Sequence, residues 1–369
     1  MTTSESSTEV SIADPQVGAR EKDAVERVLD SGQLACGTEV DRFESEFADY
    51  CNVAEGVATA NGTAALHAAL EAVGVGEGDA VVTTPFTFIA TANAVRFTGA
   101  EPVFADIDPE TYNLAPDAVE RVLDSRDDVA AIVVVHLYGL PADMDALAAL
   151  ADAHDVPLVE DAAQAHGARH RGRPVGSIGD VGCFSFYPTK NMTTGEGGMV
   201  VTDRADVAER ARQFVDHGRD EGYRHVRVGY NYRMTDVAAA LGRIQLDRLP
   251  DYVETRRANA ARLTDAIADT SLSAPTEPAC TRHAYNQYTV RTDQRDALRD
   301  HLSEFGVDTA VYYPRPVHEQ SAYAGVEATA PAAERAADGV VSLPVHPQLC
   351  QRDLDTVVTA IDYFESATR

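Results

Sequence analysis

The chain has 369 residues, of which 44% are hydrophobic, and its 59 acidic residues outnumber 31 Lys and Arg to give a net charge of −28. This length favours two domains with a sizeable core. The acidity argues against nucleic acid or an anionic membrane as a partner, because both repel a negative surface.

Five scattered cysteines form no C-x-x-C pair, and the 11 histidines show no metal-ligand spacing, so we expect neither disulfides nor a bound metal. No apolar run is long enough to span a membrane, and we predict a cytoplasmic protein. Residues 1–10 are polar and acidic, without the apolar segment of a signal peptide, and we expect them to form a disordered tail.

The basic residues are nearly all arginine, since Lys22 and Lys190 are the only lysines of the chain. Acidic residues spread along a chain, with arginine in place of lysine, are typical of adaptation to high salt, where screening reduces self-repulsion. A merely acidic protein from a low-salt organism is the alternative. We therefore predict a halophilic protein.

Between residues 21 and 167 the pattern alternates between helix and strand. Helices are predicted at 21–32, 39–51, 114–124 and 144–155, strand–turn–helix units at 56–79 and 80–99, and strands at 100–108, 129–139 and 156–167. This alternation predicts an α/β fold with a mostly parallel sheet. Ligands of such sheets bind at the carboxyl ends of the strands, where polar residues fall at Asn61, Thr63, Thr87, His136, Asp161 and Gln164.

After Gly198 the pattern changes. Residues 200–267 predict a helix, an irregular segment and a long helix kinked near Pro250. From residue 271 onward short strands and helices mix in an α+β pattern. We predict a large α/β domain at 11–250 and a small C-terminal α+β domain at 251–369.

Lys190 lies in the segment "CFSFYPTKNMTTGEGGMV". Arginine would serve there if only a cation were needed, whereas lysine can also lose its proton and form a Schiff base with a carbonyl. A surface lysine left by chance is the alternative. Asp161 closes the strand "VPLVED"; such an acid is often a helix cap, but beside a Schiff-base lysine it suggests the partner of a pyridine nitrogen.

Two weaker signals point to a cofactor with a phosphate group and an aromatic ring. In "NGTAAL" (61–66), Thr63 and the backbone N–H groups at the start of a helix could bind a phosphate, although many turns share this composition. Phe88 in "PFTFIA" could stack on an aromatic ring, although an isolated phenylalanine more often belongs to the core.

Nine segments in order carry a more specific signal: "GTEVDRFESEFADY", "NGTAALHAAL", "PFTFIATANAV", "PVFADIDPETYNL", "VVHLYGLPADM", "VEDAAQAHGA", "FSFYPTKNMTTGEGGMV", "GYNYRMTDVAAALGRIQL" and "YYPRPVHEQSAY". Together they resemble the DegT/DnrJ/EryC1/StrS family of pyridoxal-phosphate-dependent sugar aminotransferases, from about Gly32 to the C-terminus. The resemblance implies the type I fold of pyridoxal-phosphate transferases, in which a mostly parallel seven-stranded sheet lies between helices and a smaller α+β domain follows.

The resemblance also implies roles around the cofactor ring. Lys190 would hold pyridoxal 5′-phosphate covalently, and Asp161 would keep the pyridine nitrogen protonated, so that the ring can act as an electron sink. Gln164 would lie beside the ring and its 3-hydroxyl group, and Phe88 would stack on the ring.

Six further residues take roles from the resemblance. Thr63, Ala64 and Ser185 would form the phosphate cradle. Asn231 in "GYNYRM" would reach the phosphate of the neighbouring subunit, which implies a homodimer with shared active sites. Tyr313 and His318 in "YYPRPVH" would line the cleft for the nucleotide-linked sugar.

The implied reaction moves an amino group from an amino acid, usually L-glutamate in this family, to a keto group of a nucleotide-diphosphate-linked sugar. Three alternatives stand beside it. Sugar dehydratases of the family carry histidine in place of the lysine, and this chain has Lys190. A cyclitol aminotransferase with the same residues fits equally well. A non-catalytic regulatory relative would be expected to lack Lys190, Asp161 or Gln164, and all three are present.

Overall fold

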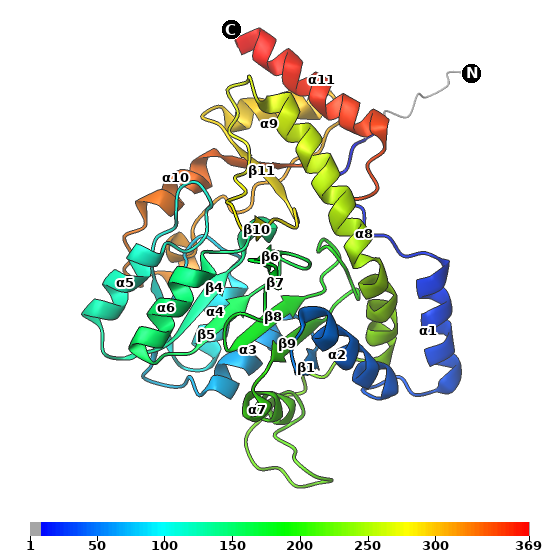
Figure 1. Ribbon diagram of the computed structural model, residues 1–369, viewed down its shortest axis with the longest axis vertical. Coiled ribbons are helices and arrows are strands. Elements are labelled where there is room, and N and C mark those ends of the chain that lie inside the picture. The colour runs from blue at the N-terminus through cyan, green and yellow to red at the C-terminus, as the bar shows by residue number, and fades with distance from the viewer. Residues whose placement is uncertain (1–8, 369) are drawn as a thin grey trace.

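A seven-stranded sheet lies at the centre of the computed structural model, which describes residues 9–368 (Figure 1). Its strand order is β1-β9-β8-β5-β4-β2-β3. β9 pairs antiparallel with β1 and β8, and the other four pairings are parallel, so the predicted mostly parallel sheet is confirmed. The strands are Glu55–Thr59 (β1), Ala80–Thr83 (β2), Glu101–Phe104 (β3), Val129–Val135 (β4), Leu158–Asp161 (β5), Val181–Ser185 (β8) and Gly198–Thr202 (β9).

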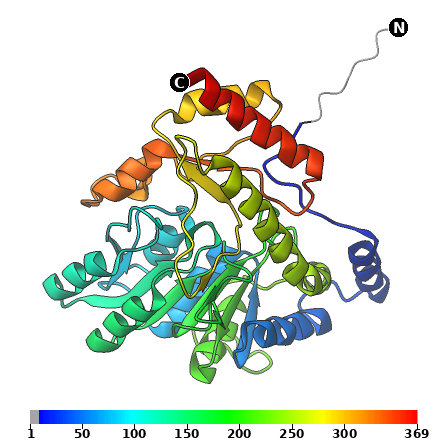
Figure 2. The ribbon, with the colours of Figure 1, turned by 45° about the horizontal axis from the view of Figure 1, so that its top comes forward.

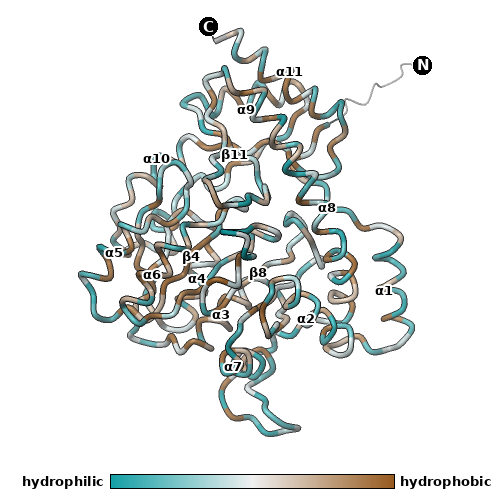
Figure 3. Tube along the Cα trace, in the orientation of Figure 1, coloured by the Kyte–Doolittle hydropathy of each residue, from teal (hydrophilic) through white to brown (hydrophobic). Residues whose placement is uncertain are grey.

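Helices cover both faces of the sheet, because alternate strand residues point to opposite faces and both sets are apolar. Val133 and Val159 pack on one face against α3, α4 and α7, and Ile132 and Val134 pack on the other face against α5 and α6. These helices are Gly62–Val73 (α3), Ala90–Phe97 (α4), Pro116–Ser125 (α5), Met144–His154 (α6) and Ala205–Val215 (α7). In Figure 3 the hydrophobic stretches gather in and around the strands.

The second face also carries a cluster that we call the α2–α8 core. In it Phe43 and Phe47 of α2 pack with Phe184, Leu249 and Val253. The helices are Ala19–Ser31 (α1), Thr38–Cys51 (α2) and Asp236–Ile267 (α8), and α1 packs against α8. Pro250 lies inside α8, which continues as a helix on both sides of the proline.

The C-terminal segments form a second cluster, the C-terminal core, above the sheet (Figures 1 and 2). Leu263 and Ile267 of α8 pack there with Val290, Leu298 and Val341. Its elements are Tyr288–Arg291 (β11), Arg295–Glu304 (α9), Val340–Leu343 (β12) and Gln351–Thr368 (α11), with Pro331–Gly339 (α10) nearby. Since α8 crosses residue 250, the predicted domain boundary at that position stays a prediction.

Short elements escaped the sequence analysis. They are the strands Arg169–His170 (β6), Arg173–Pro174 (β7) and Thr281–Arg282 (β10), which form a small sheet, and the 3₁₀ turns Leu137–Gly139 (η1), Val317–Glu319 (η2) and Ser321–Tyr323 (η3). Among residues 9–368, no helix has the length and apolar character needed to cross a membrane.

The predicted disordered tail is wrong at its C-terminal end. Val10 is buried in the C-terminal core, and its backbone exchanges hydrogen bonds with Gly306 and Asp308, at 2.8 and 2.9 Å. The chain is therefore ordered before residue 11, because an apolar side chain and two backbone groups fix Val10 in place. Residues 1–8 of the predicted tail lie outside the described residues.

Candidate active site

Lys190 lies in the loop that connects β8 to β9. Its backbone N–H donates to the carbonyl of Tyr187 at 2.9 Å. The next residue anchors the loop, since the buried side chain of Asn191 donates to the carbonyls of Ala284 and His166, at 3.0 and 3.3 Å. These contacts hold Lys190 at the carboxyl end of β8, where ligands of parallel sheets bind.

A cavity of about 790 Å³ opens beside this loop. Eight of the ten residues to which the family resemblance assigns a role line it: Thr63, Ala64, Phe88, Asp161, Gln164, Ser185, Lys190 and Tyr313. They come from α3, the loop before α4, the end of β5 and the segment after it, the end of β8, the Lys190 loop, and the segment between α9 and η2. The fold thus brings residues far apart in sequence to one site.

Burial shapes the charge of Lys190. Removal from water lowers the pKa of its amine from 10.5 to about 8, and the negative charge of Asp161 opposes that shift. The amine is therefore close to the point at which it can act as a base or nucleophile near neutral pH.

Asp161 ends β5, between β4 and β8, and its side chain is buried. Burial raises the pKa of its carboxyl group. Hydrogen bonds oppose this effect: the hydroxyl of Thr91 donates to Oδ2 at 2.7 Å, and the backbone N–H of Ala163 donates to Oδ1 at 3.2 Å. Sequence analysis missed Thr91; its one signal is a hydroxyl four residues after Thr87 within an otherwise apolar stretch.

The start of α3 lies against the end of β8 and forms a cradle. Asn61 caps the helix, since its Oδ1 accepts the N–H of Ala64 at 2.9 Å. Gly62 has no side chain, and a Cβ atom there would lie 2.6 Å from Cβ of Ser185. Only glycine permits this approach, which places the helix N-terminus beside the Ser185 hydroxyl as a phosphate site requires.

Gln164 is held in one orientation. Its Oε1 accepts the backbone N–H of Tyr138 at 2.8 Å, and its Nε2 donates to the hydroxyl of Tyr313 at 2.8 Å. The ring of Phe88 is 57% exposed, with its centroid 6.1 Å from that of Tyr313. An aromatic face left open on a cavity wall can stack on a flat ligand. The anchor Tyr138 was not found from the sequence, because its contribution is a backbone group.

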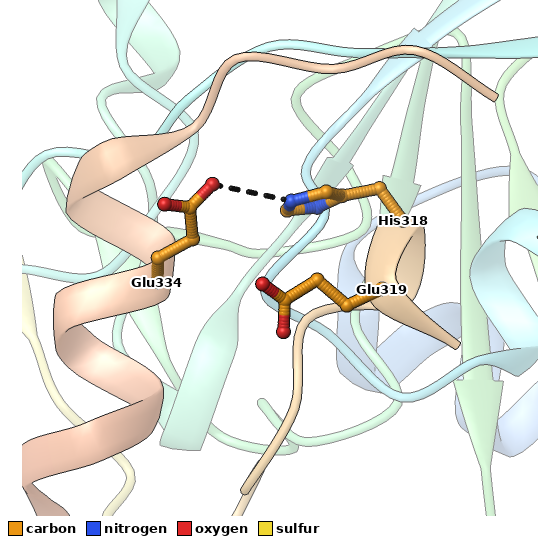
Figure 4. Close-up of side chains that lie close together, drawn as sticks. All are labelled: His318, Glu319 and Glu334. Atoms are coloured by element: carbon orange, nitrogen blue, oxygen red, sulfur yellow. Dashed lines mark hydrogen bonds and ion pairs between the residues drawn. The ribbon is translucent and has the colours of Figure 1, made fainter. Parts of the chain in front are cut away.

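Two predicted residues do not line the cavity. His318 lies in η2, where its Nε2 is 3.4 Å from Glu334 (Figure 4). Its ring also packs on Phe104. Ligand atoms of His318, Glu319 and Glu334 lie within 4.8 Å of one another, a spacing that a cation could bridge, but both carboxylates reach solvent and we assign no ion to them. Asn231 forms an isolated antiparallel bridge with Asp216 in the segment between α7 and α8, and it does not line this chain's cavity although the next residue, Tyr232, does.

The sequence profile of the DegT/DnrJ/EryC1/StrS aminotransferase family matches residues 15–362. The chain belongs to this family. A dTDP-3-amino-3,4,6-trideoxy-alpha-D-glucose transaminase from Streptomyces venezuelae is 43% identical, over 92% of this chain and 90% of the relative. A pleiotropic regulatory protein from Geobacillus stearothermophilus is 41% identical, over 93% of this chain and 95% of the relative.

Solved structures of the DegT/DnrJ/EryC1/StrS family share the fold. The crystal structure of S. venezuelae DesV superposes with a TM-score of 0.91 at 42% identity and covers 94% of this chain and 95% of that one. This likeness confirms the expected type I fold, and the chain is an aminotransferase.

Aminotransferases of this family depend on pyridoxal 5′-phosphate (PLP). The residues present fit this cofactor. The cavity offers a lysine for its aldehyde, a buried carboxylate for its ring nitrogen, and a helix N-terminus with an adjacent hydroxyl for its phosphate. The exposed aromatic face of Phe88 can stack on the cofactor ring.

Proposed function

We propose that this aminotransferase moves an amino group from an amino acid, with L-glutamate as the expected donor, to a keto group of a nucleotide-diphosphate-linked sugar for amino-sugar biosynthesis. The observation that carries the proposal is the convergence of Lys190, Asp161 and Gln164 on one cavity, in a chain 43% identical to a dTDP-sugar transaminase. The cavity is far larger than an amino acid needs, which suits a bulkier second substrate.

The chain's own residues account for the proton transfers. Bound PLP supplies the electron sink that makes loss of the Cα proton of the amino acid feasible. Lys190 Nζ, when neutral, accepts that proton and can return it at a neighbouring carbon, because its lowered pKa allows both states near neutral pH. Asp161 would favour a proton on the ring nitrogen of bound PLP through its negative charge.

The alternatives differ in what they require. A dehydratase of this family is expected to carry histidine at position 190, and the chain has lysine. A cyclitol aminotransferase would use the same residues, so only the acceptor distinguishes it. A regulatory role, suggested by the name of the G. stearothermophilus relative, requires no turnover.

Absorbance spectra of the PLP-loaded protein in high salt, before and after addition of L-glutamate, test the proposal. We expect a visible cofactor band that L-glutamate converts to a near-ultraviolet band, and that keto sugars linked to dTDP, UDP or GDP then restore. Lys190→Arg, which keeps the positive charge, should abolish both changes. Restoration by a keto cyclitol alone would move the assignment to that class, and absence of any bound cofactor would favour the regulatory role.

We also propose a homodimer with shared sites. The segment between α7 and α8 projects from the chain (Figure 1) and exposes Tyr223 and Val228 to 96% and 86%. Among the described residues that line the cavity, Lys190 is the only lysine, and there is no arginine. A nucleotide diphosphate is anionic, so its binding calls for further positive charge. A partner's projecting segment, which carries Arg227 and Asn231, would supply the missing charge and phosphate contact.

Co-expression of two impaired chains, Lys190→Ala and Asn231→Asp, tests the sharing of sites. Half of the dimers formed at random are mixed, and each mixed dimer has one site with both native residues, so we expect about a quarter of the wild-type activity. Activity no higher than that of the separate variants would contradict shared sites.

We also propose a cellular location and a salt requirement for the protein. All five cysteines are free thiols, which suits the reducing cytoplasm that we propose as its location. The net charge of −28 supports the proposal of a halophilic protein.

A further inference from the structure

The carboxylate of Asp161 is positioned in two steps. Its backbone is fixed by the sheet, since its carbonyl accepts the N–H of His136 at 3.1 Å and the N–H of Ala162 donates to Cys183 at 2.8 Å. These bonds leave the side chain free to rotate about its two single bonds. Its rotation is set by the partners of its two oxygens, Thr91 at Oδ2 and Ala163 at Oδ1.

The hydroxyl of Thr91 is itself held by a second hydroxyl. Thr87 Oγ1 lies 3.1 Å from Thr91 Oγ1. An ionised carboxylate can only accept, so the single hydrogen of Thr91 goes to Asp161, and Thr87 must be the donor to Thr91. The result is a directed chain from Thr87 to Thr91 to Asp161. All three side chains are buried and belong to the wall of the cavity.

We propose that Thr91, supported by Thr87, is a positioning residue for the cofactor: it fixes the rotation of the Asp161 carboxylate and keeps it ionised for the ring nitrogen of PLP. Thr91 at Oδ2 and Ala163 at Oδ1 each use one acceptor position of the carboxylate, and the positions that remain are held in a fixed direction for the ring nitrogen. A carboxylate buried without this hydroxyl would take up a proton more readily, because burial disfavours its charge. It would then share a proton with the ring nitrogen less effectively.

The chain offers a matched control in Thr83. Like Thr91, it is a fully buried threonine whose hydroxyl donates one hydrogen bond, at 2.9 Å to the carbonyl of Val133. Thr83 is not part of the cavity wall. Thr83→Val and Thr91→Val therefore remove the same group at the same depth, and only the second removes it from Asp161.

The first measurement is the affinity for PLP of the cofactor-free protein, by fluorescence titration in high salt. We expect Thr91→Val to bind PLP about tenfold or more weakly, as the loss of a hydrogen bond to a charged group predicts. Thr91→Ser, which keeps the hydroxyl, and Thr83→Val should bind as the wild type does. Thr87→Val should show a smaller loss.

The second measurement is the ¹⁵N chemical shift of labelled PLP bound to each variant, which reports whether the ring nitrogen carries a proton. We expect the shift to move toward that of neutral pyridine in Thr91→Val and to stay that of pyridinium in Thr91→Ser and Thr83→Val. If Thr91→Val does not fold, as thermal unfolding of the cofactor-free protein would show, Thr91→Ala replaces it in both measurements.

The outcomes separate this proposal from the assignment of the cofactor. A wild-type protein that fails to bind PLP would overturn the cofactor itself. A wild-type protein that binds PLP, beside a folded Thr91→Val with the same affinity and the same ¹⁵N shift as Thr83→Val, would overturn the positioning role of Thr91 alone.

Discussion

Lys190 owes its chemistry to two neighbouring influences of opposite sign. Burial lowers the pKa of the amine to about 8, and the charge of Asp161 limits the shift. Below this pKa the amine is protonated and unreactive, and above it the amine is neutral and nucleophilic. The covalent attachment of PLP should follow this titration.

We therefore expect the rate at which PLP attaches to the cofactor-free protein to rise between pH 7 and pH 8 and to level off above about pH 8. Borohydride trapping followed by mass spectrometry measures this rate. In Asp161→Asn the midpoint should move to lower pH, because the charge that raises the pKa of Lys190 is gone. A midpoint near the ordinary 10.5 would show that the amine is not buried as described.

The residues that the sequence analysis identified are those whose side-chain type itself indicates a chemical role. A lysine kept where arginine is the rule, and an acid at the end of an apolar strand, are visible without a structure. Thr91 is not, because a threonine in an apolar stretch has many uses and its value depends on the carboxylate 2.7 Å away. The roles of Asn231 and His318 stay predictions, since neither lines the cavity of its own chain.

At the scale of elements, the N-terminus of α3 depends on one missing side chain. Gly62→Ala would place a Cβ atom 2.6 Å from that of Ser185 and push the helix from β8. We expect PLP to bind at least about tenfold more weakly, because the phosphate cradle would open. Equilibrium dialysis measures the loss.

Gly76→Ala is the matched control for this substitution. Gly76 follows the same helix, but a Cβ atom there meets nothing within 4 Å. Its affinity for PLP should equal that of the wild type. Equal affinities of the two variants would mean that the approach of α3 to Ser185 does not form the phosphate site.

Most elements were predictable because hydrophobic periodicity governs long helices and buried strands. The antiparallel direction of β9 was not, since strand direction depends on pairing partners and not on local pattern. The strands β6, β7 and β10 have two residues each, which is too short to show the alternation of apolar and polar residues that marks a strand. The kink expected near Pro250 rests on the local chemistry of proline. The continuation of α8 past Pro250 depends on tertiary packing, since Leu249 and Val253 on either side of it are buried in the α2–α8 core.

At the scale of the whole molecule, the charge of −28 sets the conditions for folding. Screening extends over about 10 Å at 0.1 M salt and about 3 Å at 1 M. We expect the unfolding temperature to fall when salt is diluted from about 2 M to about 0.1 M, because repulsion among the carboxylates then acts over longer distances. Differential scanning fluorimetry measures the fall.

Sucrose separates screening from general stabilisation, because it is excluded from protein surfaces but carries no charge. Sucrose at matched osmolality should restore only part of the stability lost at low salt. An unfolding temperature independent of salt would contradict the proposed halophilic character.

Helix α8 joins the two cores as a single rod. Its 32 residues span about 48 Å, with Leu249 and Val253 in the α2–α8 core and Leu263 and Ile267 in the C-terminal core. A helix that unravels at one end loses the support of the other, so the cores share their cooperativity. A substitution that destabilises the C-terminal core should therefore also loosen, through this shared helix, the α2–α8 core, which includes Met192 of the Lys190 loop.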